Sequence, residues 1–150
     1  MIVTLDVQNQ EVLTVLQSLF ASITHPKPAL VAVGQELKTR VSDRFQSQTN
    51  PAGHAWATWA PSTVKSYPKD GHHKVLDRYG DMLASLNWQA DNTQVQIGFG
   101  TPYAAYHEWG TQTMPRRGLL TEDPDAGQLS QSDETAVLEI LMSFFDSVVG

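Results

Sequence analysis

The chain opens on an alternating pattern of apolar and polar residues that gives way to a helical one. From Ile2 to Val7 apolar residues occupy alternate positions, which predicts a half-buried strand. From Asn9 to Ile23 they recur at intervals of three and four residues, which predicts an amphipathic helix with Asn9 as its N-cap. Pro26 and Pro28 then break the helical pattern, because proline lacks a backbone donor and restricts the residue before it.

Helical periodicity returns in three later segments. Residues from Ala29 to Gln46 form one amphipathic helix, and those from Asp133 to Val148 form another, which Ser132 or Asp133 can cap. Between them, the run from Tyr103 to Trp109 predicts about two helical turns that end at Gly110.

The middle of the chain mixes a loop, a short helix and a hairpin. Residues 47–71 contain three prolines and two tryptophans, Trp56 and Trp59, and predict a long loop. Residues from Lys74 to Leu86 predict a short helix that is interrupted or kinked at Gly80. Two alternating segments, 86–90 and 95–99, flank a turn-forming Asp-Asn pair and predict a hairpin that also pairs with the N-terminal strand.

These elements predict one α+β domain over residues 1–150. Its small antiparallel sheet, made of the N-terminal strand and the hairpin near 86–99, packs with several amphipathic helices. A chain of 150 residues is long enough for one ordinary core.

Charge and composition narrow the functional classes. The formal net charge is −6 and the isoelectric point is near 5.2, which argues against binding nucleic acid by neutralising its phosphates. An acidic surface instead suits a passage that DNA crosses without adhering. Cysteine is absent, so disulfides, thiolate metal sites and cysteine nucleophiles are excluded, and this fits a reducing cytoplasm. No apolar stretch is long enough to predict a membrane-spanning helix.

Candidate chemistry centres on His107-Glu108, yet the spacing is unfavourable. A zinc protease motif needs a second histidine four residues after the first, and position 111 is Thr. A three-dimensional metal cluster of histidines with Glu108 or an aspartate stays open, as does a carboxylate pair that includes Glu108. The alternative function of a different class is a small metal-dependent hydrolase that uses His107 and Glu108. The other residues in these alternatives are His54, Asp70, His72, His73, Asp77 and Asp81. We expect no enzymatic activity, no cofactor, no metal and no small-molecule substrate.

An aromatic set favours contacts over catalysis. Tyr103, Tyr106 and Trp109 recur every third residue and share one side of a helix, where core packing and interface packing are both open. Arg116 follows Pro115 and can form a directional bond to a carboxylate or phosphate, although paired arginines are often only surface residues.

Taken in order, several segments resemble the phage virion morphogenesis family, which includes tail completion proteins of Mu-like and related contractile-tailed phages. The resemblance spans about residues 40–120. It departs at Tyr79, where the family often has Thr, and at Arg117-Gly118, which replaces the common Arg-Pro-Phe ending. The matching segments are Arg44-Phe45, Asn50 to Trp56 leading to Trp59-Ala60-Pro61, Leu76 to Leu86, Val95 to Gly98, Tyr103-Ala104 with His107-Glu108 and Gly110, and Pro115-Arg116 through Leu120.

The resemblance implies a structural protein of the virion, assembled in the host cytoplasm. It would complete or terminate the tail at its head-proximal end and support head–tail joining, as a ring-shaped, hexamer-like homo-oligomer. Its partners would be itself, the tail tube and the head–tail connector, and DNA would pass without specific binding. A neck or head-side connector is the alternative within the same class. The contact candidates are Trp56, Trp59, Tyr103, Tyr106, His107, Glu108, Trp109, Gly110, Pro115 and Arg116.

Overall fold

A computed structural model describes residues 26–67 and 69–149, so the strand predicted at 2–7 and the helix predicted at 9–23 lie outside the described residues. The fold is α+β, as predicted. Its elements in chain order are α2 (Lys27–Ser47), α3 (Pro61–Ser66), α4 (Asp81–Ala84), β1 (Leu86–Ala90), β2 (Val95–Phe99), α5 (Ala104–Trp109) and α6 (Gln131–Val149).

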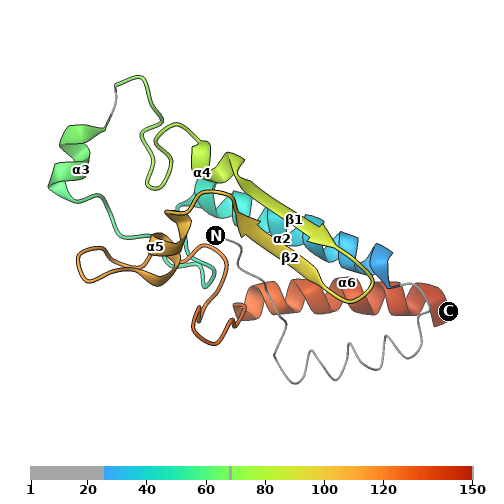
Figure 1. Ribbon diagram of the computed structural model, residues 1–150. Coiled ribbons are helices and arrows are strands. Elements are labelled where there is room, and N and C mark those ends of the chain that lie inside the picture. The colour runs from blue at the N-terminus through green and yellow to red at the C-terminus, as the bar shows by residue number, and fades with distance from the viewer. Residues whose placement is uncertain (1–25, 68, 150) are drawn as a thin grey trace.

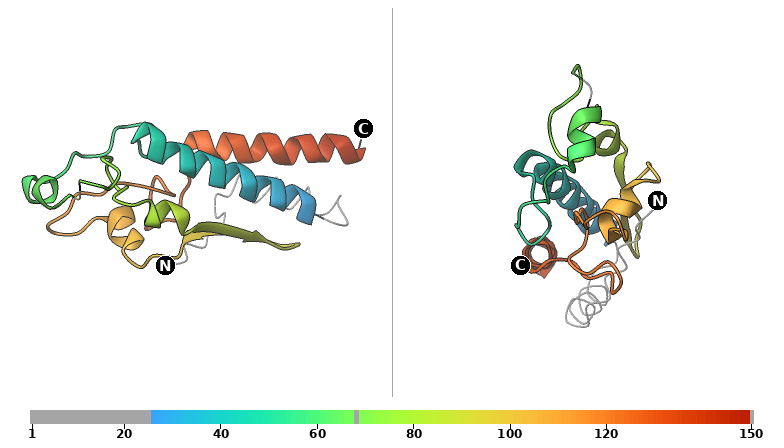
Figure 2. Two further views of the ribbon diagram at one scale, coloured as in Figure 1. Left: turned by 90° about the horizontal axis from the view of Figure 1, so that it is seen from above. Right: turned by 90° about the vertical axis from the view of Figure 1, so that its left-hand side faces the viewer.

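Helix α2 is the central element of the described fold. Helix α6 runs beside it, and the β1–β2 hairpin packs on another side of it (Figures 1 and 2). The apolar stripe predicted for α2 is buried between these two neighbours, because each offers a matching apolar face. The buried apolar residues that α2, the hairpin and α6 contribute are Ala29, Leu30, Val33, Leu37, Val41, Phe45, Leu86, Ile97, Phe99, Val137 and Leu141.

The hairpin has the register that its alternation predicts. Leu86 pairs with Phe99 and Trp88 pairs with Ile97, so the apolar residues of both strands share the face that meets α2. On the other face Gln89 donates to Gln96 across the strands at 2.6 Å. Within the described residues the sheet has two strands, and its predicted pairing with residues 2–7 lies outside them.

Contact between α2 and the hairpin depends on one small residue. A Cβ atom added at Gly34 would lie 2.3 Å from Cε3 of Trp88, a separation that carbon atoms cannot adopt. Gly34 therefore lets the indole of Trp88 lie directly on the helix backbone.

Three predicted elements differ from the structure. The helix expected from Lys74 to Leu86 is confined to α4, because Leu76 and Gly80 both have positive φ and the chain turns before Asp81. The loop predicted at 47–71 contains the six-residue helix α3. The N-cap of α6 is Ser130 rather than Ser132 or Asp133, since the Ser130 hydroxyl accepts the Asp133 N–H at 3.2 Å.

Candidate functional site

Helix α5 forms where the sequence predicts it, at one end of the α2–α6 pair (Figure 1). Gly110 ends the helix with φ +74, a conformation that strains residues with a side chain. A Cβ atom there would also lie 3.0 Å from the backbone nitrogen of Arg116, because the chain folds back closely after the helix. Gly110 thus brings residues 116–121 against α5.

Glu108 holds this returning segment in place. Its side chain is buried, and its carboxylate accepts backbone N–H groups from Leu119 at 2.7 Å, Leu120 at 3.0 Å and Thr121 at 2.9 Å. The Thr121 hydroxyl donates to the same carboxylate. Four donors satisfy a buried charge that would otherwise be costly. Glu108 is therefore an internal anchor of the fold.

Arg116 also holds the returning segment 116–121 against α5. Its guanidinium donates to three backbone carbonyls of its own chain, those of Glu108 at 2.6 Å, Thr121 at 2.6 Å and Glu122 at 3.0 Å. One nitrogen also lies 3.7 Å from the Glu108 carboxylate. The directional bonding expected of Arg116 is thus made within the chain.

Two further arginines join this region to the rest of the molecule. Arg117 donates to the carbonyls of Ala57 at 2.8 Å and Thr58 at 2.9 Å, and burial lowers the pKa of its guanidinium. Arg44 of α2 donates to the Leu119 carbonyl at 2.8 Å and forms an ion pair with Asp133 of α6. We call Arg44, Glu108, Arg116, Arg117, Thr121 and Asp133 the polar cluster.

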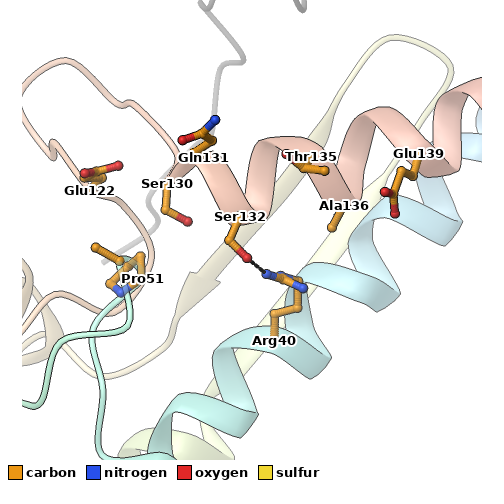
Figure 3. Close-up of a pocket in the computed structure, with 10 residues that line it drawn as sticks. Arg40, Pro51, Glu122, Ser130, Gln131, Ser132, Thr135, Ala136 and Glu139 are labelled. Atoms are coloured by element: carbon orange, nitrogen blue, oxygen red, sulfur yellow. Dashed lines mark hydrogen bonds between the residues drawn. The ribbon is translucent and has the colours of Figure 1, made fainter.

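The polar cluster continues to the first turn of α6. Arg40 donates through Nε to Asp133 at 2.7 Å. It also donates through Nη2 to the Ser132 hydroxyl, as the dashed line in Figure 3 marks. A polar cavity of about 660 Å³ opens beside these residues, with Glu139 at its margin (Figure 3). Arg40 is already paired with Asp133 and with Glu36, so this cavity has no unpaired cation.

The aromatic face predicted on α5 is at the surface. Tyr103, Tyr106 and Trp109 are 44%, 58% and 43% exposed, which excludes core packing for them within the described chain. Trp109 donates its indole N–H to Asp125 at 3.1 Å, so its ring is held in one orientation. Three large exposed aromatic residues on one short helix are typical of a contact surface.

The two loop tryptophans have different surroundings. Trp56 is buried against Phe45, with ring centroids 5.4 Å apart, and donates to the Gly118 carbonyl at 3.0 Å. Trp59 is half-buried and lies 4.6 Å from the ring of Tyr67. Trp56 therefore belongs to the core, and Trp59 belongs to a groove beside α5.

This groove lies between α5 and residues 58–82 and has a volume of about 660 Å³. Its walls are largely aromatic and apolar, with Pro115 and Met114 at one side. His107 lines it, and burial together with the charge of Arg117 lowers the pKa of its imidazole to about 4. His107 is accordingly neutral at physiological pH.

The residues considered for metal binding or hydrolysis do not gather into one metal site, although His107, Asp77 and Asp81 line the same groove. No group of three or more His, Asp and Glu side chains in the described part of the chain is arranged to hold a metal ion. His72 pairs with Asp77 at 2.9 Å, while Glu108 is enclosed and does not line the groove that Asp77 and Asp81 line. His54 is exposed on the loop before Trp56.

Comparison with known proteins agrees with the segment order noted in the sequence. The model of the phage virion morphogenesis family matches residues 7–146. This chain belongs to that family. A relative, the Mu-like prophage FluMu G protein 2 of Haemophilus influenzae, is 21% identical over 140 residues that cover 93% of each chain. No solved structure matches the chain significantly.

Membership in the phage virion morphogenesis family indicates a structural, virion-associated protein of phage morphogenesis. None of the described helices has the length and hydropathy to cross a membrane. Contact with a second protein stays a prediction for all ten candidate residues, but the structure shows that they differ in exposure and in role. Trp56 and Glu108 are enclosed, Gly110 and Arg116 shape the turn, and the exposed rings of α5 are open to a partner.

Sequence reasoning missed Arg44, Arg117, Thr121 and Asp133 as members of the polar cluster. A signal for Arg44 was present, because it lies three residues after Val41 and beside Phe45 on the buried stripe of α2. A charge on such a stripe predicts a buried ion pair. The partner, 89 residues away, carries no comparable signal.

Proposed function

We propose that this protein completes the phage tail at its head-proximal end, as a ring-shaped homo-oligomer, and supports the joining of tail and head. The observation that carries the proposal is the exposed aromatic face of α5, held rigid by the polar cluster beneath it. A ring subunit needs fixed surfaces that present aromatic area to a neighbour. The family match supports the setting in phage morphogenesis.

The charge distribution supports a place beside DNA that is in transit. The net charge is −6, and the final 33 residues, from Gly118 to Gly150, contain seven Asp and Glu residues and no Lys or Arg. A ring with such a surface repels the phosphates of passing DNA. The proposed partners are other copies of the chain, the tail tube and the head–tail connector.

The test is an induced prophage from which the gene is deleted. We expect lysates to accumulate unjoined heads and tails, or tails of faulty length, in negatively stained electron micrographs. Joined, infectious particles at normal yield would overturn the proposal. A neck connector would instead leave tails of normal length that carry their terminating structure, so tail length separates the two positions.

Complementation then tests the aromatic face. Tyr106→Ala and Trp109→Ala should lower the yield of joined particles while the purified variants unfold close to the wild-type transition. Met142→Ala is the matched control, since Met142 is a similarly exposed apolar residue, 46% exposed, on α6. Equal loss of yield in all three variants would remove the special role of α5.

A further inference from the structure

Residues 57–67 and 69–80 form a basic arm in an acidic protein. The arm carries four Lys and Arg residues and two Asp residues, a formal charge of +2, so the rest of the chain, at −6 in total, has −8. All four basic side chains are exposed, and they are Lys65, Lys69, Lys74 and Arg78. The arm lies at the opposite end of the molecule from the C-terminal end of α6 (Figures 1 and 2).

Within the arm, helix α3 has little support of its own, whereas the residues after it are bonded to one another, as in the Tyr67–Lys74 hydrogen bond and the His72–Asp77 pair. Helix α3 buries none of its residues, and Val64 on it is 54% exposed. Six residues are too few for a helix that is stable by itself in water. Such a helix gains stability when another surface covers its apolar side.

The groove at the base of the arm contains unsatisfied polar groups. Among the described residues, the buried side-chain polar atoms without a hydrogen-bond partner are Nε1 of Trp59 and Nδ1 of His107. Both residues line the groove between the arm and α5. An unmet buried hydrogen bond costs about 1–3 kcal/mol. A polypeptide that enters the groove, with small shifts of its walls, can offer these atoms a carbonyl and a donor or acceptor.

A surface of complementary character lies on the other side of α5. Tyr106 and Trp109 are exposed there, next to the turn at 122–125, whose acidic side chains Glu122, Asp123 and Asp125 are also exposed. The arm and this acidic turn lie on opposite sides of α5 in Figure 1 and are also separated in the right-hand view of Figure 2. One face thus combines aromatic rings with acids. The other combines an aromatic groove, which Asp77 and Asp81 also line, with the four exposed basic side chains of the arm.

We propose that the basic arm and its groove bind the Tyr106–Trp109 edge and the acidic turn of a second copy of this chain. The inference rests on the proposed function, and it specifies which surfaces meet in the ring. The two surfaces are different, so the contact is heterologous and can repeat around a closing axis. Opposite charges at the rim select this register and speed the encounter.

In this proposal the arm binds a protein surface. Nucleic acid is the alternative partner, because basic segments often bind phosphates. The −8 carried by the rest of the chain opposes phosphate binding. The aspartates at 70 and 77, interspersed among the four basic residues, weaken a phosphate track further. These charges instead match a short acidic turn.

Charge reversal tests the contact. One variant carries Lys65→Glu and Lys69→Glu in the arm, and a second carries Glu122→Lys and Asp125→Lys in the turn. Sedimentation velocity of the full chain at low salt should give a dissociation constant for self-association that is raised about tenfold or more in each variant. High salt should weaken the wild-type assembly in the same direction.

Mixing the two variants is the decisive step. Each alone opposes like charges, whereas a mixture pairs a negative arm with a positive turn and a positive arm with a negative turn. We expect the mixture, and the single chain with all four substitutions, to recover most of the lost affinity, because the charges pair again while Asp125→Lys still removes the acceptor of the Trp109 indole N–H. A wild-type chain that stays monomeric, variants that associate as tightly as wild type, or a mixture that fails to recover would each overturn the inference.

Matched controls separate this contact from a general effect of charge. Lys27→Glu with Lys38→Glu on α2, and Glu139→Lys with Asp146→Lys on α6, change the charge equally at exposed positions elsewhere. Both controls should assemble as wild type, and circular dichroism should be the same for all variants. An effect as large in the controls would overturn the assignment to the arm and the turn.

A labelled DNA duplex tests the competing partner. Fluorescence anisotropy should show no loss of duplex binding that is specific to the arm variant. Loss of duplex binding with unchanged self-association would overturn the inference in favour of nucleic acid. The prophage deletion tests the proposed function independently of this contact. If the deletion gives unjoined heads and tails while the arm variant self-associates as tightly as wild type, the proposed function is retained and only this contact is overturned.

Discussion

The polar cluster and the basic arm are neighbours, yet they treat their polar groups in opposite ways. In the cluster, the Glu108 carboxylate receives four donors and the arginines on either side of it are bonded to backbone carbonyls. In the arm, the basic side chains are exposed, and Trp59 at its base has an unpartnered indole N–H. The comparison teaches that Glu108 and its arginine neighbours, which look like an active site in the sequence, stabilise the fold. The arm, which precedes them in the chain, has the exposed and unpartnered groups that a binding surface needs.

The largest expected loss of stability comes from removing the carboxylate at the centre of the polar cluster. Glu108→Ala leaves the backbone N–H groups of residues 119–121 unpaired, and it should lower the free energy of unfolding by about 3–5 kcal/mol. In the arm, Val64→Ser should stay within about 0.5 kcal/mol of wild type, because Val64 is mostly exposed. Urea unfolding at one low protein concentration measures both.

Two additional variants keep this comparison informative. Glu108→Gln retains an acceptor oxygen and should fall between the wild type and Glu108→Ala, which covers the case in which the alanine variant does not fold. Glu139→Ala removes an exposed carboxylate from α6 and should change little. A loss below about 1 kcal/mol for Glu108→Ala would contradict the internal role of this residue.

A smaller effect is expected at the contact between α2 and the hairpin. Gly34→Ala adds a methyl group where Trp88 already lies, so it should destabilise the fold by about 1–3 kcal/mol, although alanine is the better helix former. Thermal unfolding measures the change. Trp88→Leu combined with Gly34→Ala should cost less than the two single changes added together. Strict additivity would mean that the two residues do not interfere.

The smallest effect at neutral pH concerns protonation at the boundary between the two regions, since this effect develops only in acid. The pKa of His107 in the fold is about 4, below its ordinary value of 6.5, so between these values the unfolded chain binds more protons than the folded one. Stability should therefore fall as the pH falls through this window and level off below it.

Urea midpoints measured across that range test the expectation. His107→Gln should reduce the slope of stability against pH, and His54→Gln is the matched variant that shows the effect of losing an exposed histidine. An unchanged slope in His107→Gln would place the imidazole in a more solvated setting than the groove provides.

Periodicity predicted the elements that bury one continuous apolar face. Helices α2 and α6 and the hairpin all lie where their apolar spacing places them, because each has one continuous face to bury. In the segment 74–86 the predicted interruption at Gly80 is confirmed, but the helical turns predicted before it are wrong, because Leu76 also has a positive φ and the chain turns there. Tertiary contacts, which spacing does not encode, decide such positions.

The contact role of the stretch 103–116 stays a prediction. The exposure of its three aromatic rings excludes the core alternative within the described chain, and this exposure could not be derived from residue spacing. The enclosure of Glu108 depends on three N–H groups that the backbone supplies regardless of residue type. A sequence pattern cannot predict a hydrogen bond whose donor is a backbone N–H, because every residue except proline carries one.

The uneven placement of lysine and arginine has a practical consequence. Trypsin cleaves after these residues, and no such site exists beyond Arg117. Several of the sites before it lie in α2, where the helix resists a protease, or at arginines engaged by the polar cluster. The accessible trypsin sites therefore lie in the arm. The rate at which trypsin cleaves the arm during brief digestion measures whether a neighbouring subunit covers it.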